Sequence, residues 1–226
     1  MKSRSRSISV GLAAAFLIGY LVNGMVGRAG ATLPADHVGV AGGTLEKLAT
    51  QTNQGQQSVA VTLLTGTMRA SNNIDLAIAF SAECALFTDV KTINQGTSED
   101  TSQAIANVEL WVEIDGHSVP VTQDQGDGKA DDGHTVFCNR DHKLNTIFND
   151  GNDNGDDSIT IADYIHSREA NAFNWMALNV PAGIHQLAVK AVLTANVTTP
   201  NGMAEALIGK RTLIVTPTHL SPDATF

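Results

Sequence analysis

The sequence has few basic residues, and this scarcity excludes several classes of partner. The chain of 226 residues has 14 Lys and Arg against 23 Asp and Glu. The first 31 residues hold four of the basic residues and none of the acidic ones. The remainder therefore has ten basic and 23 acidic residues, a net charge of −13. Binding to nucleic acid or to an anionic membrane surface needs a basic face, so neither is expected, and cations are the favoured partners.

The short motifs of common catalytic and nucleotide-binding sites are also missing. The sequence has no GxSxG, HExxH, P-loop or GxGxxG pattern, and its seven histidines show no metal-ligand spacing. Glu109 and Glu113 are two strand repeats apart, which places both side chains on the same face of a strand. They are therefore the remaining candidates for the paired carboxylates of a glycoside hydrolase. Alternating glutamates are more often found on a solvated strand face, and we therefore expect a non-catalytic protein.

Long apolar runs are absent after residue 26, and the single one lies near the N-terminus. Three basic residues precede the apolar run 8–26, and residues 29–31 read Ala-Gly-Ala. This order of segments predicts a secretory signal peptide, residues 1–31. The alternative is an uncleaved anchor, because the run approaches the length of a membrane span. If the signal peptide is cleaved, we expect a secreted, extracellular or cell-surface protein without a membrane anchor.

Cysteine is scarce, with only Cys84 and Cys138 in the chain. In an exported protein an even pair predicts a disulfide. A bridge over this sequence separation stabilises the fold by roughly 4 kcal/mol in the chain-entropy model. The alternative, a thiol pair that binds metal or acts as a nucleophile, has no CxxC spacing in its favour.

Alternation of apolar and polar residues dominates the sequence from Ser58 onward. In NVELWVEID, for example, Val108, Leu110 and Val112 would face the core while Glu109 and Trp111 face solvent. Eight or nine such runs, separated by turn signals such as Asp-Gly at 115–116, predict an all-β antiparallel sandwich over residues 58–226. Residues 32–57 are rich in Gly, Thr and Gln, and they predict a flexible segment with a short helix at 44–50.

Two stretches carry resemblances to known families. NVPAGIHQLAVKA resembles the closing hairpin of immunoglobulin-like and fibronectin-like domains, which implies an immunoglobulin-like sandwich, and a jelly roll is the alternative. ANAFNW and GKRTLIV resemble stretches of exported bacterial β-sandwich proteins that have no assigned function.

Aspartate is concentrated in an expected loop insertion at about residues 115–163, which holds eleven of the acidic residues. Within it, NDNGDDSITIAD at 152–163 offers oxygen ligands at alternate positions, the arrangement that Ca²⁺ prefers. The pattern resembles the calcium repeat of dockerins and EF-hands, and this resemblance implies an exiting helix at 162–173. The metal ligands that it implies are Asn152, Asn154, Asp156, Ser158 and Asp163.

The stretch QDQGDGKADDGH resembles half of the DGxxDD calcium repeat of extracellular adhesive proteins. Asp127, Asp131 and Asp132 match that repeat, and a solvated hairpin loop is the alternative interpretation. In both loops the calcium would be structural, since it would neutralise a block of carboxylates that otherwise repel one another.

Three hypotheses of function follow. The first is an exported structural or surface module stabilised by calcium and a disulfide. The second is a carbohydrate-binding or adhesion module, in which Trp111 or Trp175 and the acidic loops would form a calcium-assisted sugar site. The alternative for Trp111 is that the acidic loops cover it. The third is a hydrolase that uses the two glutamates. Within the first class, residues 32–57 would donate a strand to a neighbouring molecule and build a filament by self-assembly.

Overall fold

The alternating segments of the sequence form strands in the computed structural model of the chain, which describes residues 38–42, 46–95, 99–122, 131–147, 158–200 and 202–218. These residues belong to the unit Ala35–Phe226 and contain strands but no helix. The strands are β1 (Val38–Gly42), β2 (Glu46–Thr52), β3 (Gly55–Ala70), β4 (Ile74–Gln95), β5 (Glu99–Ile114), β6 (His117–Ser118), β7 (Thr135–Ile147), β8 (Ser158–Val180), β9 (Gly183–Val197) and β10 (Met203–Thr218).

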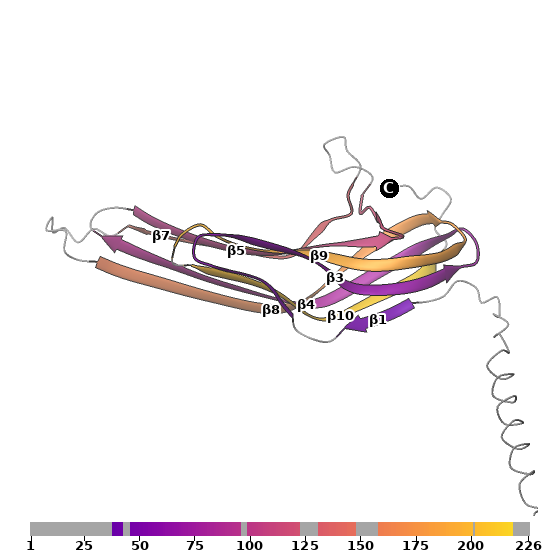
Figure 1. The fold of residues 1–226 in the computed structure, drawn as a ribbon, viewed down its shortest axis with the longest axis horizontal. Coiled ribbons are helices and arrows are strands. Elements are labelled where there is room, and N and C mark those ends of the chain that lie inside the picture. Colours follow the sequence, from indigo (N-terminus) through magenta and orange to yellow (C-terminus); the bar gives the residue numbers. More distant parts are fainter. Residues whose placement is uncertain are drawn as a thin grey trace, which may run out of the picture. The chain divides into compact units, whose positions relative to one another are not determined.

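The strands form two antiparallel sheets that pack face to face (Figure 1). Sheet A has the order β1-β10-β4-β8, with β2 also paired to β10, and sheet B has the order β3-β9-β5-β6, with β7 also paired to β5. The pairs are nested, because the first strands pair with the last, β3 with β9, β4 with β8 and β5 with β7. A long hairpin that rolls up on itself produces this nesting, which is the connectivity of a jelly roll. The antiparallel β-sandwich is confirmed, and the strand order is that of the jelly-roll alternative.

The large apolar core residues gather at one end of the sandwich. Trp175, Phe80, Met68 and Leu110 are fully buried there, near the start of β4 and the ends of β3, β5 and β8. The interior around the second half of β4 contains Leu86 and Val90 together with several smaller or polar side chains, which are Thr88, Thr92, Ser102, Ala104, Ala106 and His142. The apolar end is therefore the part of the sandwich where an apolar cavity would form.

The predicted disulfide between Cys84 and Cys138 is confirmed. Cys84 lies on β4 of sheet A and Cys138 on β7 of sheet B, and their Cα atoms are 6.7 Å apart. Both residues are buried. The bridge therefore joins the two sheets through the core.

The prediction of a flexible segment at 32–57 with a helix at 44–50 is wrong for the described residues. Strands β1 and β2 and the start of β3 lie in this range. Ala49 is fully buried and Val40 packs against the core, and both β1 and β2 pair with β10. Burial against the rest of the chain thus fixes a segment whose own sequence pattern is weak.

The helix expected at 162–173 is also wrong, because these residues lie in the middle of β8. That strand pairs with β4 in nearly continuous register from Ile74↔Val180 to Gln95↔Ser158. The expected insertion at 115–163 is likewise not one loop, since it contains β6, β7 and the first residues of β8. In addition, β8 and β9 belong to different sheets, so the turn at 181–182 crosses between the sheets and does not close a hairpin.

Candidate functional site

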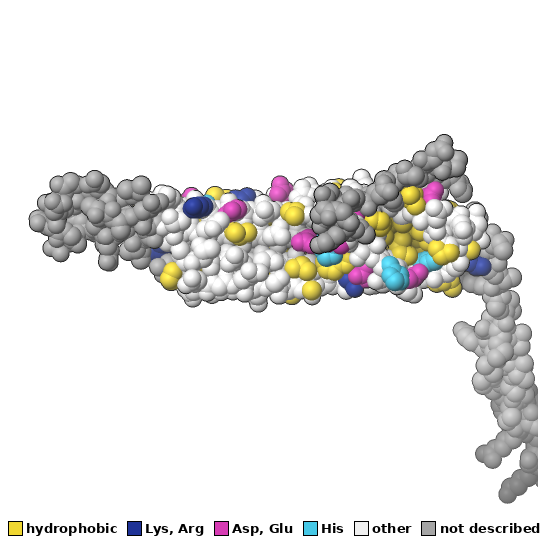
Figure 2. Space-filling model, turned by 90° about the horizontal axis from the view of Figure 1, so that it is seen from above, with side chains coloured by type: hydrophobic (Ala, Val, Ile, Leu, Met, Phe, Trp, Pro, Cys, Tyr) yellow, Lys and Arg dark blue, Asp and Glu magenta, His cyan; other side chains and the backbone are white. Residues whose placement is uncertain are grey.

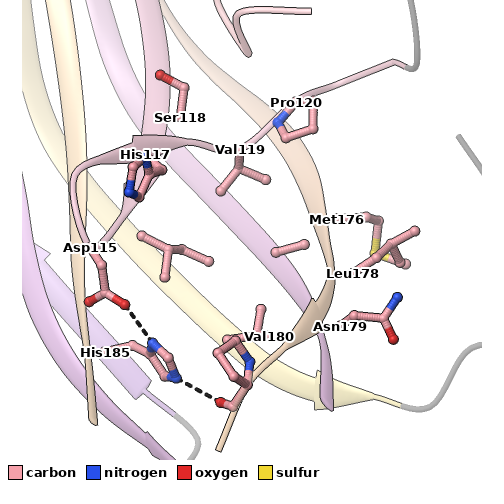
Figure 3. A pocket seen from close by; sticks show the side chains of 13 residues that line it. Asp115, His117, Ser118, Val119, Pro120, Met176, Leu178, Asn179, Val180 and His185 are labelled. Atoms are coloured by element: carbon pink, nitrogen blue, oxygen red, sulfur yellow. Dashed lines mark hydrogen bonds and ion pairs between the residues drawn. The ribbon is translucent and has the colours of Figure 1, made fainter. Parts of the chain in front are cut away.

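An apolar cavity of about 450 Å³ lies at the end of the sandwich that holds the large core residues. The end of β5, strand β6 and residues 119–120 form one wall, and the end of β8 with its following turn forms the other (Figure 3). Most of the lining side chains are apolar: Ile114, Val119, Pro120, Met176, Ala177, Leu178, Val180 and Pro181. Figure 2 shows hydrophobic side chains gathered beside histidine and acidic side chains toward one end of the face in view.

The Asp115-Gly116 turn shapes the first wall. Both residues have positive φ, 53° and 81°, as a two-residue type I′ hairpin turn requires. The backbone N–H of Asp115 donates to the carbonyl of Gln186 at 2.8 Å, and the N–H of Gln186 donates to Asp115 Oδ1 at 2.8 Å. The expected hairpin is confirmed, and these two hydrogen bonds dock it on β9.

His185 connects the two walls. Its side chain is 6% exposed, its Nδ1 lies 2.7 Å from Asp115 Oδ2, and its Nε2 lies 2.8 Å from the carbonyl oxygen of Pro181. Both partners are hydrogen-bond acceptors, so both ring nitrogens must carry a proton to satisfy them. His185 is therefore an imidazolium that holds the hairpin and the β8–β9 turn together.

The electrostatics of the pair agree with this protonation state. The hydrogen bond from His185 to the Asp115 carboxylate raises the pKa of His185 above its ordinary value, although burial acts in the opposite direction. The backbone N–H of Gln186, and next the His185 side chain, hold the pKa of Asp115 below its ordinary value. The charges of the two side chains compensate each other at the cavity wall.

This arrangement favours binding over proton transfer. A general base needs a free nitrogen within reach of a substrate proton, but both nitrogens of His185 are already bonded within the protein. No sequence motif marks His185. A signal was present, because the alternation that places Leu187 and Val189 inside also places His185 inside.

Trp111, the expected glycan contact, is half-buried on the outer face of sheet B. The His134 ring stacks on its indole with centroids 4.2 Å apart, and its Nε1–H donates to Glu113 at 2.9 Å. His134 in turn contacts Glu109 at 2.5 Å, while Glu113 pairs with Lys190 at 2.8 Å. One face of Trp111 is thus covered, and both candidate glutamates have partners within the protein.

The first candidate calcium loop lies mostly outside the described residues. Asn152, Asn154 and Asp156 are among those outside, and Ser158 begins β8. Asp163 is described, and its Oδ2 lies 3.1 Å from Nε2 of the buried His142. The structure therefore places Asp163 on a strand, beside a histidine.

Of the second set of candidate calcium ligands, Asp127 lies outside the described residues. Asp131 Oδ2 accepts hydrogen bonds from the backbone N–H groups of Val121 and Thr122, and its Oδ1 accepts one from Gly133. Asp132 Oδ1 accepts one from the N–H of His134. These two carboxylates stabilise the loop that leads into β7.

Two features are absent from the described ranges. No group of three or more His, Cys, Asp or Glu side chains is arranged there to hold a metal ion. Nor do those ranges contain a helix with the length and apolarity that crossing a bilayer requires.

The chain has few detectable similarities to known proteins. No protein-family model and no curated protein matches the chain. Among solved structures, the VP2 subviral particle of infectious bursal disease virus shows 11% identity and a TM-score of 0.16, over 81% of this chain and 42% of that chain. The Gx strain of the same virus shows 12% identity and a TM-score of 0.16, over 83% and 45%. The chain thus spans less than half of those proteins, and TM-scores this low carry no argument.

Proposed function

We propose that the chain is an exported, non-catalytic structural module of a cell surface or extracellular matrix. The observation that carries this proposal is the Cys84–Cys138 bridge between the two sheets. Structural disulfides persist in oxidising compartments and are rare in the cytosol. The predicted signal peptide supports the same destination.

The candidate polar side chains are bonded to other groups of the protein, and this supports a non-catalytic role. The imidazole of His185 is bonded at both nitrogens, and Glu109 and Glu113 contact His134 and Lys190. Groups that perform acid–base chemistry need access to the substrate, whereas these contacts hold strands and turns in place.

Structural calcium remains part of the proposal. The eleven aspartates between residues 115 and 163 would repel one another without counter-ions, and hard oxygen ligands on loops suit Ca²⁺. The site that we propose is the loop 152–157 together with the start of β8.

Cell fractionation tests the main proposal. Antibody against the chain should find it in the medium or on the surface, shortened by the signal peptide, with the bridge formed. A chain of full length in the cytosol with two free thiols would overturn the proposal.

A second candidate function, a filament subunit, is favoured by the position of β1 and β2. Among the described strands both pair only with β10, so they form an edge of sheet A. Val38 and Val40 fill the space above Gly66, since a Cβ on Gly66 would lie 3.4 Å and 3.2 Å from them. The same strand from a second copy would fit this groove equally well, and its exchange would link subunits.

A designed disulfide distinguishes internal pairing from exchange. Gly39 and Ile214 are directly opposed in the β1–β10 pair, and a Cβ on Gly39 would meet open space. In the double variant Gly39→Cys, Ile214→Cys, strand exchange predicts a ladder of covalent oligomers on a non-reducing gel. A monomer band alone would contradict exchange, and Gly39→Cys by itself is the control.

A further inference from the structure

The cavity between β6 and the end of β8 is a concave apolar site with no assigned occupant. Its volume of about 450 Å³ falls within the range of small-molecule sites, roughly 300–1,000 Å³. Such sites combine an apolar lining with a few polar groups that orient the ligand. Here Ser118, His117 and Asn179 are the polar residues at the rim.

The walls of the cavity are preformed. Asp115 and Asn179 are two of the three non-glycine residues with positive φ in the described ranges, at 53° and 54°. Such backbone conformations persist where surrounding contacts fix them, and they gather at functional sites. The contacts here come from His185 and Gln186 for Asp115, and from Asp75 for Asn179, whose N–H donates to its Oδ1 at 2.9 Å.

The charge at the wall selects against an ionic ligand. Asp115 and His185 compensate each other, and each oxygen of Asp115 already accepts a hydrogen bond. A charged ligand that enters the apolar space would lose hydration without gaining a counter-charge. A neutral ligand does not incur that cost.

A proline argues against a peptide strand as the occupant. Strand addition draws its affinity from main-chain hydrogen bonds along a free edge. The edge at β6 is only two residues long and is followed closely by Pro120, which has no N–H to donate. The β6 wall therefore offers no continuous ladder of main-chain hydrogen bonds to a peptide strand.

We propose that this cavity binds a small, uncharged apolar molecule, such as one ring or branched chain that carries at most a hydroxyl group. The apolar part lies against Val119, Met176 and Leu178, and the hydroxyl group points to the polar side chains of the rim. This site is independent of export, calcium and strand exchange, so its test is separate from theirs.

The experiment is an NMR titration of the folded chain, residues 32–226, with ¹³C-labelled methyl groups. Benzyl alcohol is the probe, and benzoate and benzylammonium are its charged counterparts. We expect saturable shifts and nuclear Overhauser contacts from benzyl alcohol to Val119 and Leu178, with binding at least tenfold weaker for both ions. The contacts in the wild-type chain identify the site without any substitution.

A matched pair of variants provides the second arm. Ala177 is buried and lines the cavity, whereas Ala172 is exposed on the same strand. Ala177→Phe should weaken binding of benzyl alcohol at least tenfold, and Ala172→Phe should leave it unchanged.

Three results would overturn the proposal. The first is no saturation up to the solubility limit of benzyl alcohol. The second is contacts located instead at the shallow hollow on sheet A beside Ala79 and Ile214. The third is tighter binding of a blocked Val-Leu-Val peptide than of benzyl alcohol, which would assign the cavity to a partner strand.

Discussion

Replacing Asp115 by asparagine tests the contact that holds the cavity walls together. The amide keeps the size of the side chain and can still accept the hydrogen bond from the N–H of Gln186. It removes the negative charge that faces the His185 imidazolium at 2.7 Å. We therefore expect Asp115→Asn to fold and to be less stable than the wild type near pH 6.

The size of the effect follows from the nature of the hydrogen bond. A hydrogen bond to a charged group contributes about 1.5–3 kcal/mol, and a neutral one about 0.5–1.5 kcal/mol. The Asp115 side chain is 44% exposed, so solvent screening places the difference at the low end. The expected loss is about 1 kcal/mol, or a fall of roughly 2–4 °C in Tm for a domain of this size.

The pH dependence of this loss has a definite sign. The pKa of His185 is raised from 6.5, so its contribution is complete below pH 6.5 and disappears as the pH rises through the folded-state pKa. The pKa of Asp115 is lowered from 3.8, so its contribution is complete above pH 3.8 and disappears as the pH falls through its folded-state pKa. The stability difference should be largest between pH 4 and 6.5 and should shrink toward pH 9.

Urea unfolding at several pH values measures this difference, and the ring-proton shifts of His185 measure its pKa directly. Asp141→Asn is the control, because Asp141 is exposed on β7 and its side chain accepts a hydrogen bond from Gln103, not from a histidine. An equal loss at all pH values, or a His185 that titrates at or below 6.5, would refute the imidazolium assignment.

Three further predictions concern stability. Replacing Cys84 and Cys138 together by alanine should lower the free energy of unfolding by about 4 kcal/mol, from the entropy of a 54-residue loop; urea unfolding with and without reductant checks this, and a loss below about 1 kcal/mol would contradict it. Gly133→Ala should lower the free energy of unfolding by at least about 1–3 kcal/mol, because Gly133 has a φ of +76° and the new Cβ would lie 2.1 Å from the carbonyl oxygen of Val119. The control, Gly39→Ala, should have the Tm of the wild type. Millimolar calcium, but not magnesium, should raise the Tm of the chain without its first 31 residues, and Asp156→Ala should abolish the rise. An unchanged Tm in calcium would contradict the proposed calcium site.

The strand pattern of the central and C-terminal segments was predictable because local and tertiary preferences agree there. The alternation of Leu187, Val189, Ala191 and Leu193 matches their burial in β9. The disulfide was predictable because an even cysteine pair behind a predicted signal peptide has few alternatives.

The wrong predictions concern segments whose structure is decided by pairing with strands distant in sequence. Residues 162–173 form a strand because β4 pairs with them along their whole length, and pairing overrides local propensity. Residues 38–42 and 46–52 have little pattern of their own, and β10 supplies their hydrogen-bond partners.

The cavity was not predictable from any local motif. Its walls come from residues 114–120, 176–181 and 185, and only the jelly-roll connectivity brings these segments together. The Asp115-Gly116 turn was recognisable from the sequence, but His185, which holds it at the cavity, lies 70 residues from Asp115 along the chain.

The most direct test of the central claim is the thiol state of the chain isolated from the cells that produce it. Cells would be lysed in a thiol-blocking reagent, and the peptides would be analysed by mass spectrometry without reduction. We expect one linked peptide pair that joins Cys84 to Cys138, recovered from the medium or surface fraction. Blocked, unlinked cysteines in a cytosolic fraction would contradict the claim that this chain is an exported, disulfide-linked structural module.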